Sequence, residues 1–166
     1  MKSSHGKALL TALVISIGLT ACSGQSPEQQ LQSAKDYLQK SDSKSALIQL
    51  KSALQQNPDL GEARFLLGKL LLEEGDATGA EIEFRKALAA KYSEPVVVPE
   101  LARALLLTGQ AQKLVAQFGS TQLGQPSADA SLQTSLAIAQ NSLGKPQAAK
   151  AALAAALNAD PNHVPA

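Results

Sequence analysis

The chain has 166 residues, which is enough for one domain. Hydrophobic residues make up 45% of it but aromatic residues only 3%, with no tryptophan, so alanine and leucine supply most of the apolar content. These residues favour close-packed helices over a β-sandwich, which is rich in β-branched and aromatic side chains. The formal net charge is +1, and the clustered basic and stacking aromatic residues of a nucleic-acid surface are missing from the sequence, so we expect no nucleic-acid partner.

The first 22 residues have the pattern of a secretory signal. Lys2 and Lys7 precede an uncharged apolar run over 8–19, and small residues lead up to Cys22. The run is short for a permanent membrane span. Its ending, "LTAC", resembles the bacterial lipoprotein signal. That resemblance implies cleavage between Ala21 and Cys22 and a covalent lipid on the Cys22 sulfur. The alternative is an ordinary signal peptide that happens to contain a cysteine.

We therefore assign 1–21 to the signal peptide and 22–26 to the acylated cysteine and a short tether. Several acyl chains anchor a protein firmly, because each buried methylene contributes about 0.8 kcal/mol. Ser23 follows the cysteine where an aspartate would retain the protein in the inner membrane of enteric-type bacteria. The resemblance thus implies a periplasm-facing location at the outer membrane, with the lipid on Cys22 as the only cofactor.

The rest of the chain repeats with a period of 34 residues. Small residues recur in register, and a fourth copy follows after a slip of one residue; the register positions are Ala34, Gly68, Ala102 and Ala137. A period of 34 with this spacing resembles the tetratricopeptide repeat, in which a helix, a tight turn and a second antiparallel helix form each copy. The resemblance implies an all-α solenoid of about four repeats, assigned to 27–60, 61–94, 95–128 and 129–162, with 163–166 as a tail or the start of a truncated fifth repeat.

Local signals place eight helices near 27–40, 43–57, 60–74, 77–92, 97–108, 111–119, 128–143 and 146–158. Ser26 starts the first helix with a partial capping box, and Asp42 and Asp76 are expected to cap second helices. Glycines end the first helices, at Gly75, Gly109 and Gly144.

Prolines mark expected helix boundaries in the repeats. Second helices are expected to close at Pro58, Pro126 and Pro161. The third repeat contains Pro95 and Pro99, so its first helix is expected to start late or to kink, and its second helix to pack less closely.

Two longer stretches narrow the resemblance. They read "SDSKSALIQLKSALQQNPDLGEARFLLGKLLLEEGDATGAEIEFRKAL" and "VVVPELARALLLTGQAQKLV". Behind a lipoprotein signal, they resemble the tetratricopeptide lipoprotein of the bacterial PEP-CTERM/exosortase system, which implies a role in exopolysaccharide production and surface-protein sorting. Members of that family have long arrays, whereas the last helix here is mostly alanine and lacks a polar capping face. We interpret the chain as an N-terminal fragment; the alternative is a short variant that dimerises through that end.

A binding groove is predicted along the first helices. Extending the register gives a basic column, Lys35, Lys69 and Arg103, beside an apolar column, Leu38, Leu72 and Leu106. These columns suit an extended or helical peptide of an envelope protein that carries acidic groups or a terminal carboxylate. The alternative is that Lys69 pairs with Glu73 and Arg103 with Glu100 on solvated helix faces, and that the leucines belong to the core between repeats.

No catalytic or metal-binding residues are predicted. The two histidines, His5 and His163, lie in the signal and the tail, and Glu81 and Glu83 are interpreted as helix-surface acids. We therefore expect a membrane-anchored protein-interaction scaffold, without enzymatic activity, that supports exopolysaccharide assembly or export. The alternatives are a general outer-membrane or pilus assembly lipoprotein and the regulatory repeat arm of a glycosyltransferase.

Overall fold

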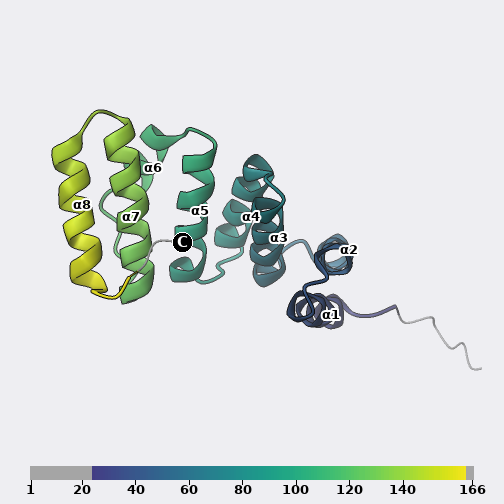
Figure 1. Ribbon diagram of the computed structural model, residues 1–166. Helices are drawn as coiled ribbons and strands as arrows, with labels where there is room; N and C mark the ends of the chain where they lie inside the picture. Colours follow the sequence, from purple (N-terminus) through teal and green to yellow (C-terminus); the bar gives the residue numbers. More distant parts are fainter. Residues whose placement is uncertain (1–23, 164–166) are drawn as a thin grey trace, which may run out of the picture.

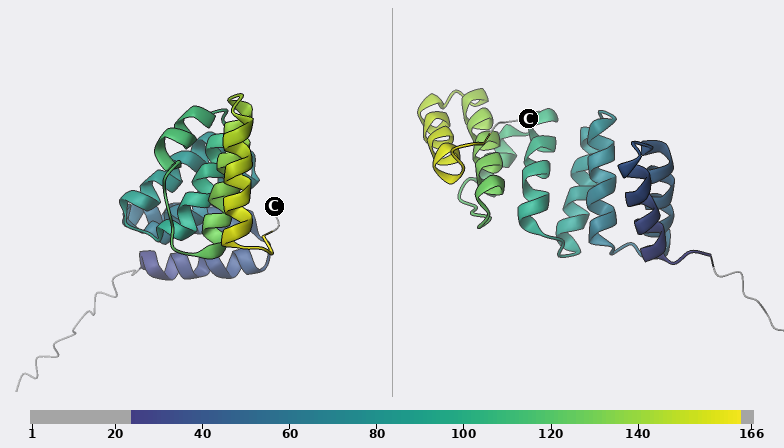
Figure 2. Two further views of the ribbon diagram at one scale, coloured as in Figure 1. Left: turned by 90° about the vertical axis from the view of Figure 1, so that its left-hand side faces the viewer. Right: turned by 60° about the horizontal axis from the view of Figure 1, so that its bottom comes forward.

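Eight α-helices make up the regular structure of residues 24–163, which the computed structural model describes. The signal peptide, the cleavage site at Ala21 and Cys22, and the last three residues lie outside the described residues. The helices follow one another along the array from α1 to α8 (Figure 1 and Figure 2). Their bounds are α1 Pro27–Gln39, α2 Ser43–Gln56, α3 Gly61–Glu73, α4 Ala77–Ala89, α5 Glu94–Leu107, α6 Ala111–Phe118, α7 Pro126–Ser142 and α8 Pro146–Ala159. The expected all-α solenoid is confirmed.

Side-chain caps set the starts of three helices. The Ser26 hydroxyl accepts a hydrogen bond from the backbone N–H of Gln29, and the Gln29 side chain accepts one from the N–H of Ser26, which completes a capping box. The carboxylate of Asp42 accepts a hydrogen bond from the backbone N–H of Ser45, the third residue of α2. The carboxylate of Asp76 likewise accepts one from the N–H of Gly79, the third residue of α4. The predicted caps are therefore confirmed.

Left-handed residues end the first helices. Gly75, Gly109 and Gly144 have φ of 86°, 72° and 71°, which is the conformation that glycine adopts without a steric penalty. In the first repeat Ser41 takes this position, with φ of 57°. Each turn is thus short enough to lay the second helix antiparallel against the first.

Small residues let paired helices approach closely. Ala34 of α1 and Ala46 of α2 are completely buried. At the register position of Ala34, the second pair has Gly68, and an added Cβ there would lie 2.6 Å from a ring carbon of Phe84. Phe84 is itself completely buried and contacts the ring of Phe65 at a centroid distance of 5.9 Å. In the second pair, the glycine on α3 therefore makes room for the large phenylalanine ring on α4.

The third pair departs from the expected helices. α5 begins at Glu94, before the expected start at residue 97, because Pro95 is tolerated in a first turn, and α5 accommodates Pro99 inside the helix. The assignment of Pro126 to the end of a second helix is wrong. α6 ends at Phe118, and Pro126 lies instead in the first turn of α7, where its missing N–H costs nothing.

α6 has only 8 residues, and this short length changes the packing of the third pair. α5 and α6 touch much less than the other pairs, and α7 packs mainly against α5 on one side and α8 on the other. The boundary placed at residue 128 between the third and fourth repeats therefore falls inside α7. The prediction that this second helix packs less closely is confirmed.

Buried acids tie neighbouring helices together, so the interpretation of Glu81 and Glu83 as surface acids is wrong. Both are 8% exposed. Glu83 accepts from Arg64 of α3 at 2.7 Å and from Lys86 at 2.8 Å. Glu81 pairs with Arg85 at 2.9 Å and with Lys113 of α6 at 2.8 Å. α6 is thus held to α4 by the charge-assisted hydrogen bond from Lys113 to Glu81.

Candidate functional site

In the basic column, Lys35 forms an ion pair between two helices, whereas Lys69 and Arg103 form none among the described residues. Lys35 donates to Glu62 of the next first helix at 2.8 Å, and the hydrogen bond and the charge of Glu62 raise the pKa of Lys35 above its usual value. Lys69 and Arg103 form no ion pair with any acid of residues 24–163, so the pairs with Glu73 and Glu100 that the alternative interpretation offered do not occur there. Lys69 and Arg103 therefore remain available to an acidic ligand.

The apolar column is likewise divided. Leu72 is 9% exposed and belongs to the main core, so it is not a groove residue. For Leu72 the alternative interpretation, a leucine of the core between repeats, is correct. Leu38 and Leu106 pack only partly against the core, and each of them lines a surface hollow.

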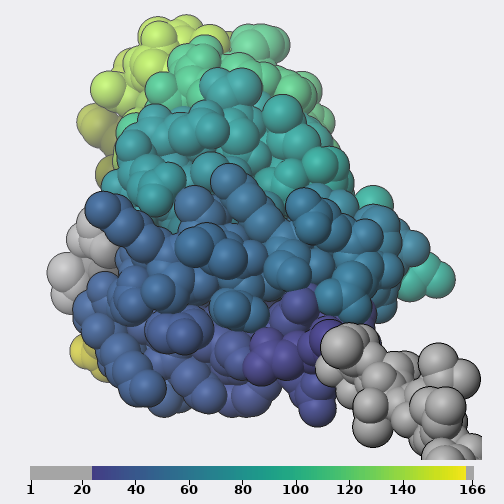
Figure 3. All heavy atoms as spheres, turned by 90° about the vertical axis from the view of Figure 1, so that its right-hand side faces the viewer, coloured from purple at the N-terminus to yellow at the C-terminus, as the bar shows by residue number. Residues whose placement is uncertain are grey.

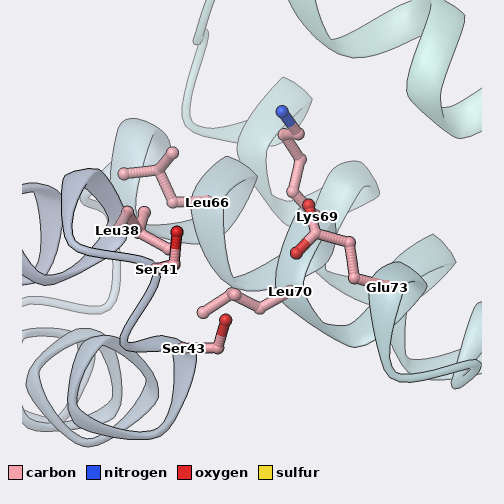
Figure 4. A pocket seen from close by; sticks show the side chains of 7 residues that line it. All are labelled: Leu38, Ser41, Ser43, Leu66, Lys69, Leu70 and Glu73. Carbon is pink, nitrogen blue, oxygen red and sulfur yellow. The ribbon is translucent and has the colours of Figure 1, made fainter.

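The first hollow lies beside Lys69. It has a volume of about 340 Å³ and is formed by the end of α1, the following turn and α3. Figure 4 shows Leu66, Lys69 and Glu73 on α3, with Leu38 and Ser41 coming from the end of α1 and the turn that follows it. Leucines beside two serine hydroxyls and two opposite charges provide contacts for an apolar side chain and for the polar main chain that carries it.

The second hollow lies beside Arg103. It has a volume of about 200 Å³, and its wall comes from α5 and α7 and from His163 after α8. Its lining residues are Pro99, Glu100, Arg103, Leu106, Ser131, Thr134, Ser135, Ile138 and His163. Arg103 is exposed at the rim, while Leu106 and Ile138 supply the apolar surface. The direct packing of α7 on α5 is what creates this hollow.

The sequence missed several of the lining residues. Ile138 lies 35 residues after Arg103, which is the register of the basic column after the one-residue slip, so the repeat alignment contained this signal. Ser41 lies in the turn after α1 and Ser43 is the first residue of α2, and only the folding of this segment against α3 brings them to Lys69. His163 reaches α5 because the chain turns back after α8.

Glu81 is the most strongly perturbed ionisable group of these helices. Burial alone raises the pKa of its carboxyl, but hydrogen bonds from Lys113, Gln110 and Arg85 outweigh burial and lower the pKa to about 2. The charge of Glu81 is paired with Arg85 and Lys113 within the protein, and Glu81 lies outside both hollows. We therefore regard the cluster as structural, a tie between α4 and α6.

The fold defines a class of protein, the α-solenoid built from antiparallel helix pairs. Two family models, both described as tetratricopeptide repeat, match residues 31–95 and 130–163. The chain is a tetratricopeptide-repeat protein. As a class, such arrays present extended surfaces that bind other proteins.

Solved structures agree on the fold. The chain is similar to PilF of Pseudomonas aeruginosa, with a TM-score of 0.64 and 22% identity, over 82% of this chain and 62% of that one. It is also similar to MamA in its crystal structure, with a TM-score of 0.66 and 16% identity, over 81% of this chain and 78% of that one. The chain thus spans less than two thirds of the PilF chain. No curated protein matches the sequence significantly.

None of the helices within residues 24–163 is both long and apolar enough to cross a bilayer.

Proposed function

We propose that this chain is a lipid-anchored scaffold that binds envelope proteins through the first-helix face of its repeats. The observation that carries the proposal is that Lys69 and Arg103 each stand beside a hollow with exposed leucine surface and have no acidic partner in the described structure. A cation beside an apolar hollow recognises a peptide that has an apolar anchor and a nearby carboxylate.

The anchor of this scaffold is the lipid on Cys22. Pro27, where α1 begins, lies five positions after Cys22, and five steps of fully extended chain span at most about 17 Å. The proposal thus holds the first repeat close to the periplasmic surface of the outer membrane. It includes no catalytic activity and no cofactor besides the lipid.

The pathway is proposed from the family resemblance. A tetratricopeptide lipoprotein of the exosortase type would hold partners of exopolysaccharide assembly or export, together with the sorting of surface proteins. A partner from outer-membrane or pilus assembly, or a glycosyltransferase, would instead favour one of the alternatives.

Site-specific photocrosslinking in the native cell tests the groove. A photoreactive residue at position 69 should trap a discrete envelope protein, and the Arg103→Glu variant should weaken that trapping severalfold. Position 48 on α2 is the matched control, because Ile48 is 65% exposed and lies outside both hollows. Equal trapping from positions 69 and 48, or trapping from neither, would refute the groove.

Fractionation with palmitate labelling tests the anchor separately. The wild-type chain should be labelled and recovered with the outer membrane. Cys22→Ser should abolish the label and release the chain from the membrane. Unchanged labelling and recovery of the Cys22→Ser chain would show that the cysteine is not the attachment point.

A further inference from the structure

The outer side of α2 combines lysines with an exposed isoleucine. Lys44, Ile48, Lys51 and Gln55 are exposed, and their spacing of i, i+4, i+7 and i+11 places them on one side of the helix, which we call the α2 stripe. Ile48 is 65% exposed, the highest value among the large apolar residues of 24–163. α2 contains no acidic residue, and neither lysine forms an ion pair within the described structure. The α2 stripe therefore presents two positive charges around an apolar side chain.

The corresponding side of α4 does not carry this charge. Thr78 takes the register position of Lys44. Arg85 takes the position of Lys51, and it pairs with Glu81 of its own helix at 2.9 Å. Positive charge without a described acidic partner is thus a property of the α2 stripe and does not follow from the repeat.

Hydrogen bonds hold the tether against the end of α2. The side-chain amide of Gln56 donates to the backbone carbonyl of Gln25 at 3.4 Å and to the side-chain oxygen of Gln30 at 3.0 Å. Since this inference rests on the proposed function, Cys22 is taken as the lipid attachment point. Cys22 lies three positions before Gln25, and three steps of fully extended chain span at most about 10 Å. The anchor therefore holds this end of α2 close to the bilayer surface.

Charge decides which helix face turns toward that surface. Figure 3 looks onto the end of the array formed by α1, in purple, and α2, in blue. The exposed stripe of α1 consists of Glu28, Gln32 and Asp36, so it carries two carboxylates. Anionic headgroups repel carboxylates and attract lysines, and each lysine close to an anionic surface raises the affinity about fivefold. An exposed isoleucine between the lysines adds apolar contact with the headgroup and acyl boundary. An anionic bilayer therefore favours the α2 stripe over the α1 stripe.

We propose that the α2 stripe lies on the anionic phospholipid surface of the membrane that holds the Cys22 lipid. The anchor keeps α2 at a high local concentration beside the surface, so a contact of two lysines and one isoleucine is enough to orient the array. None of the four stripe residues lines either first-helix hollow, so the membrane contact leaves both hollows open to a partner.

Tryptophan fluorescence tests this orientation, because the chain contains no tryptophan of its own and only one cysteine. The chain from Cys22 onward would be coupled through the Cys22 sulfur to a maleimide lipid in vesicles of phosphatidylcholine and phosphatidylglycerol with brominated acyl chains. Ile48→Trp reports on the α2 stripe, and Gln32→Trp on the α1 stripe is the matched control. We expect bromine quenching to be severalfold stronger at position 48 than at position 32.

Charge reversal separates the α2 stripe from the general affinity of tryptophan for interfaces. In the Ile48→Trp chain, Lys44→Glu together with Lys51→Glu should lower quenching to the level of the control, and vesicles of phosphatidylcholine alone should do the same. Circular dichroism would verify that the variants stay folded. Equal quenching at positions 48 and 32, or quenching at 48 that survives both charge reversals, would overturn the proposal.

Two further outcomes identify what fails. A discrete envelope protein trapped by photocrosslinking from position 48 in the cell would overturn the membrane contact in favour of a protein partner. Chemical coupling supplies the anchor in the vesicles, so weak quenching there refutes the α2 stripe without affecting the lipoprotein assignment. Conversely, charge-dependent quenching together with unchanged palmitate labelling of Cys22→Ser would support the stripe and refute the anchor.

Discussion

The close contact between Gly68 of α3 and Phe84 of α4 leads to a quantitative prediction. In Gly68→Ala, the new methyl group would meet the ring of Phe84 at 2.6 Å, and that ring is enclosed by the core on all sides. Overpacking of this kind costs about 1–3 kcal/mol. Alanine is favoured over glycine inside a helix by about 1 kcal/mol. The free energy of unfolding should therefore fall by about 1 kcal/mol, although the helix propensity rises.

The first repeat supplies the compensating change. There the same two positions hold Ala34 and Leu50, and both are completely buried without a clash. Phe84→Leu alone leaves a cavity and should cost about 1–2 kcal/mol. In the double variant the alanine methyl group occupies part of that space, so its total loss should be less than the sum of the single losses by about 1 kcal/mol or more.

Urea unfolding followed by far-ultraviolet circular dichroism would measure this coupling. Phe84→Leu is the control, because it provides the background in which Gly68→Ala should become neutral or stabilising. Additive single effects, or a stabilising Gly68→Ala in the wild-type background, would refute the argument that the close approach of α3 and α4 requires glycine.

Three further predictions concern the helices around this pair. Because the folded pKa of Glu81 is about 2 and its ordinary value is 4.5, its ion pairs and hydrogen bonds should contribute about 3 kcal/mol above pH 4.5 that are lost as the pH falls toward 2; Glu81→Gln should flatten this part of the stability curve, and an equally steep curve in the variant would contradict the assignment. Arg64→Met leaves Glu83 buried with Lys86 as its remaining ion-pair partner and should cost about 2–4 kcal/mol in urea unfolding, whereas a loss below 1 kcal/mol would show that the carboxylate is solvated. Pro99→Ala restores a backbone donor inside α5 and should raise the midpoint of thermal unfolding, and a lower midpoint would mean that the proline ring contributes more by packing than it costs the helix.

Much of the fold follows from local chemistry that a sequence displays directly. The caps at Ser26, Asp42 and Asp76 and the left-handed glycines at the turns depend on residues within a few positions of one another. The 34-residue register depends on which positions are small, because helix pairs approach closely only at such positions. These features are enough to establish the helix pairs and their order.

Other features depend on contacts between residues far apart in the chain. Pro126 is equally acceptable after one helix or in the first turn of the next, and the packing of α7 on α5 decides between them. Glu81 resembles a surface acid until α6 brings Lys113 and Gln110 to it.

The candidate binding surfaces show the same division. Lys35, Lys69 and Arg103 share one register, yet within residues 24–163 only Lys35 forms an ion pair, with Glu62 of the next first helix. Leu50 and Leu153 likewise share one register, and only the helix that packs on α2 makes the first of them core. The sequence by itself determined the repeat and the residue at each position. The tertiary structure alone decided which of these positions are covered, because burial depends on the neighbouring helix as well as on the residue.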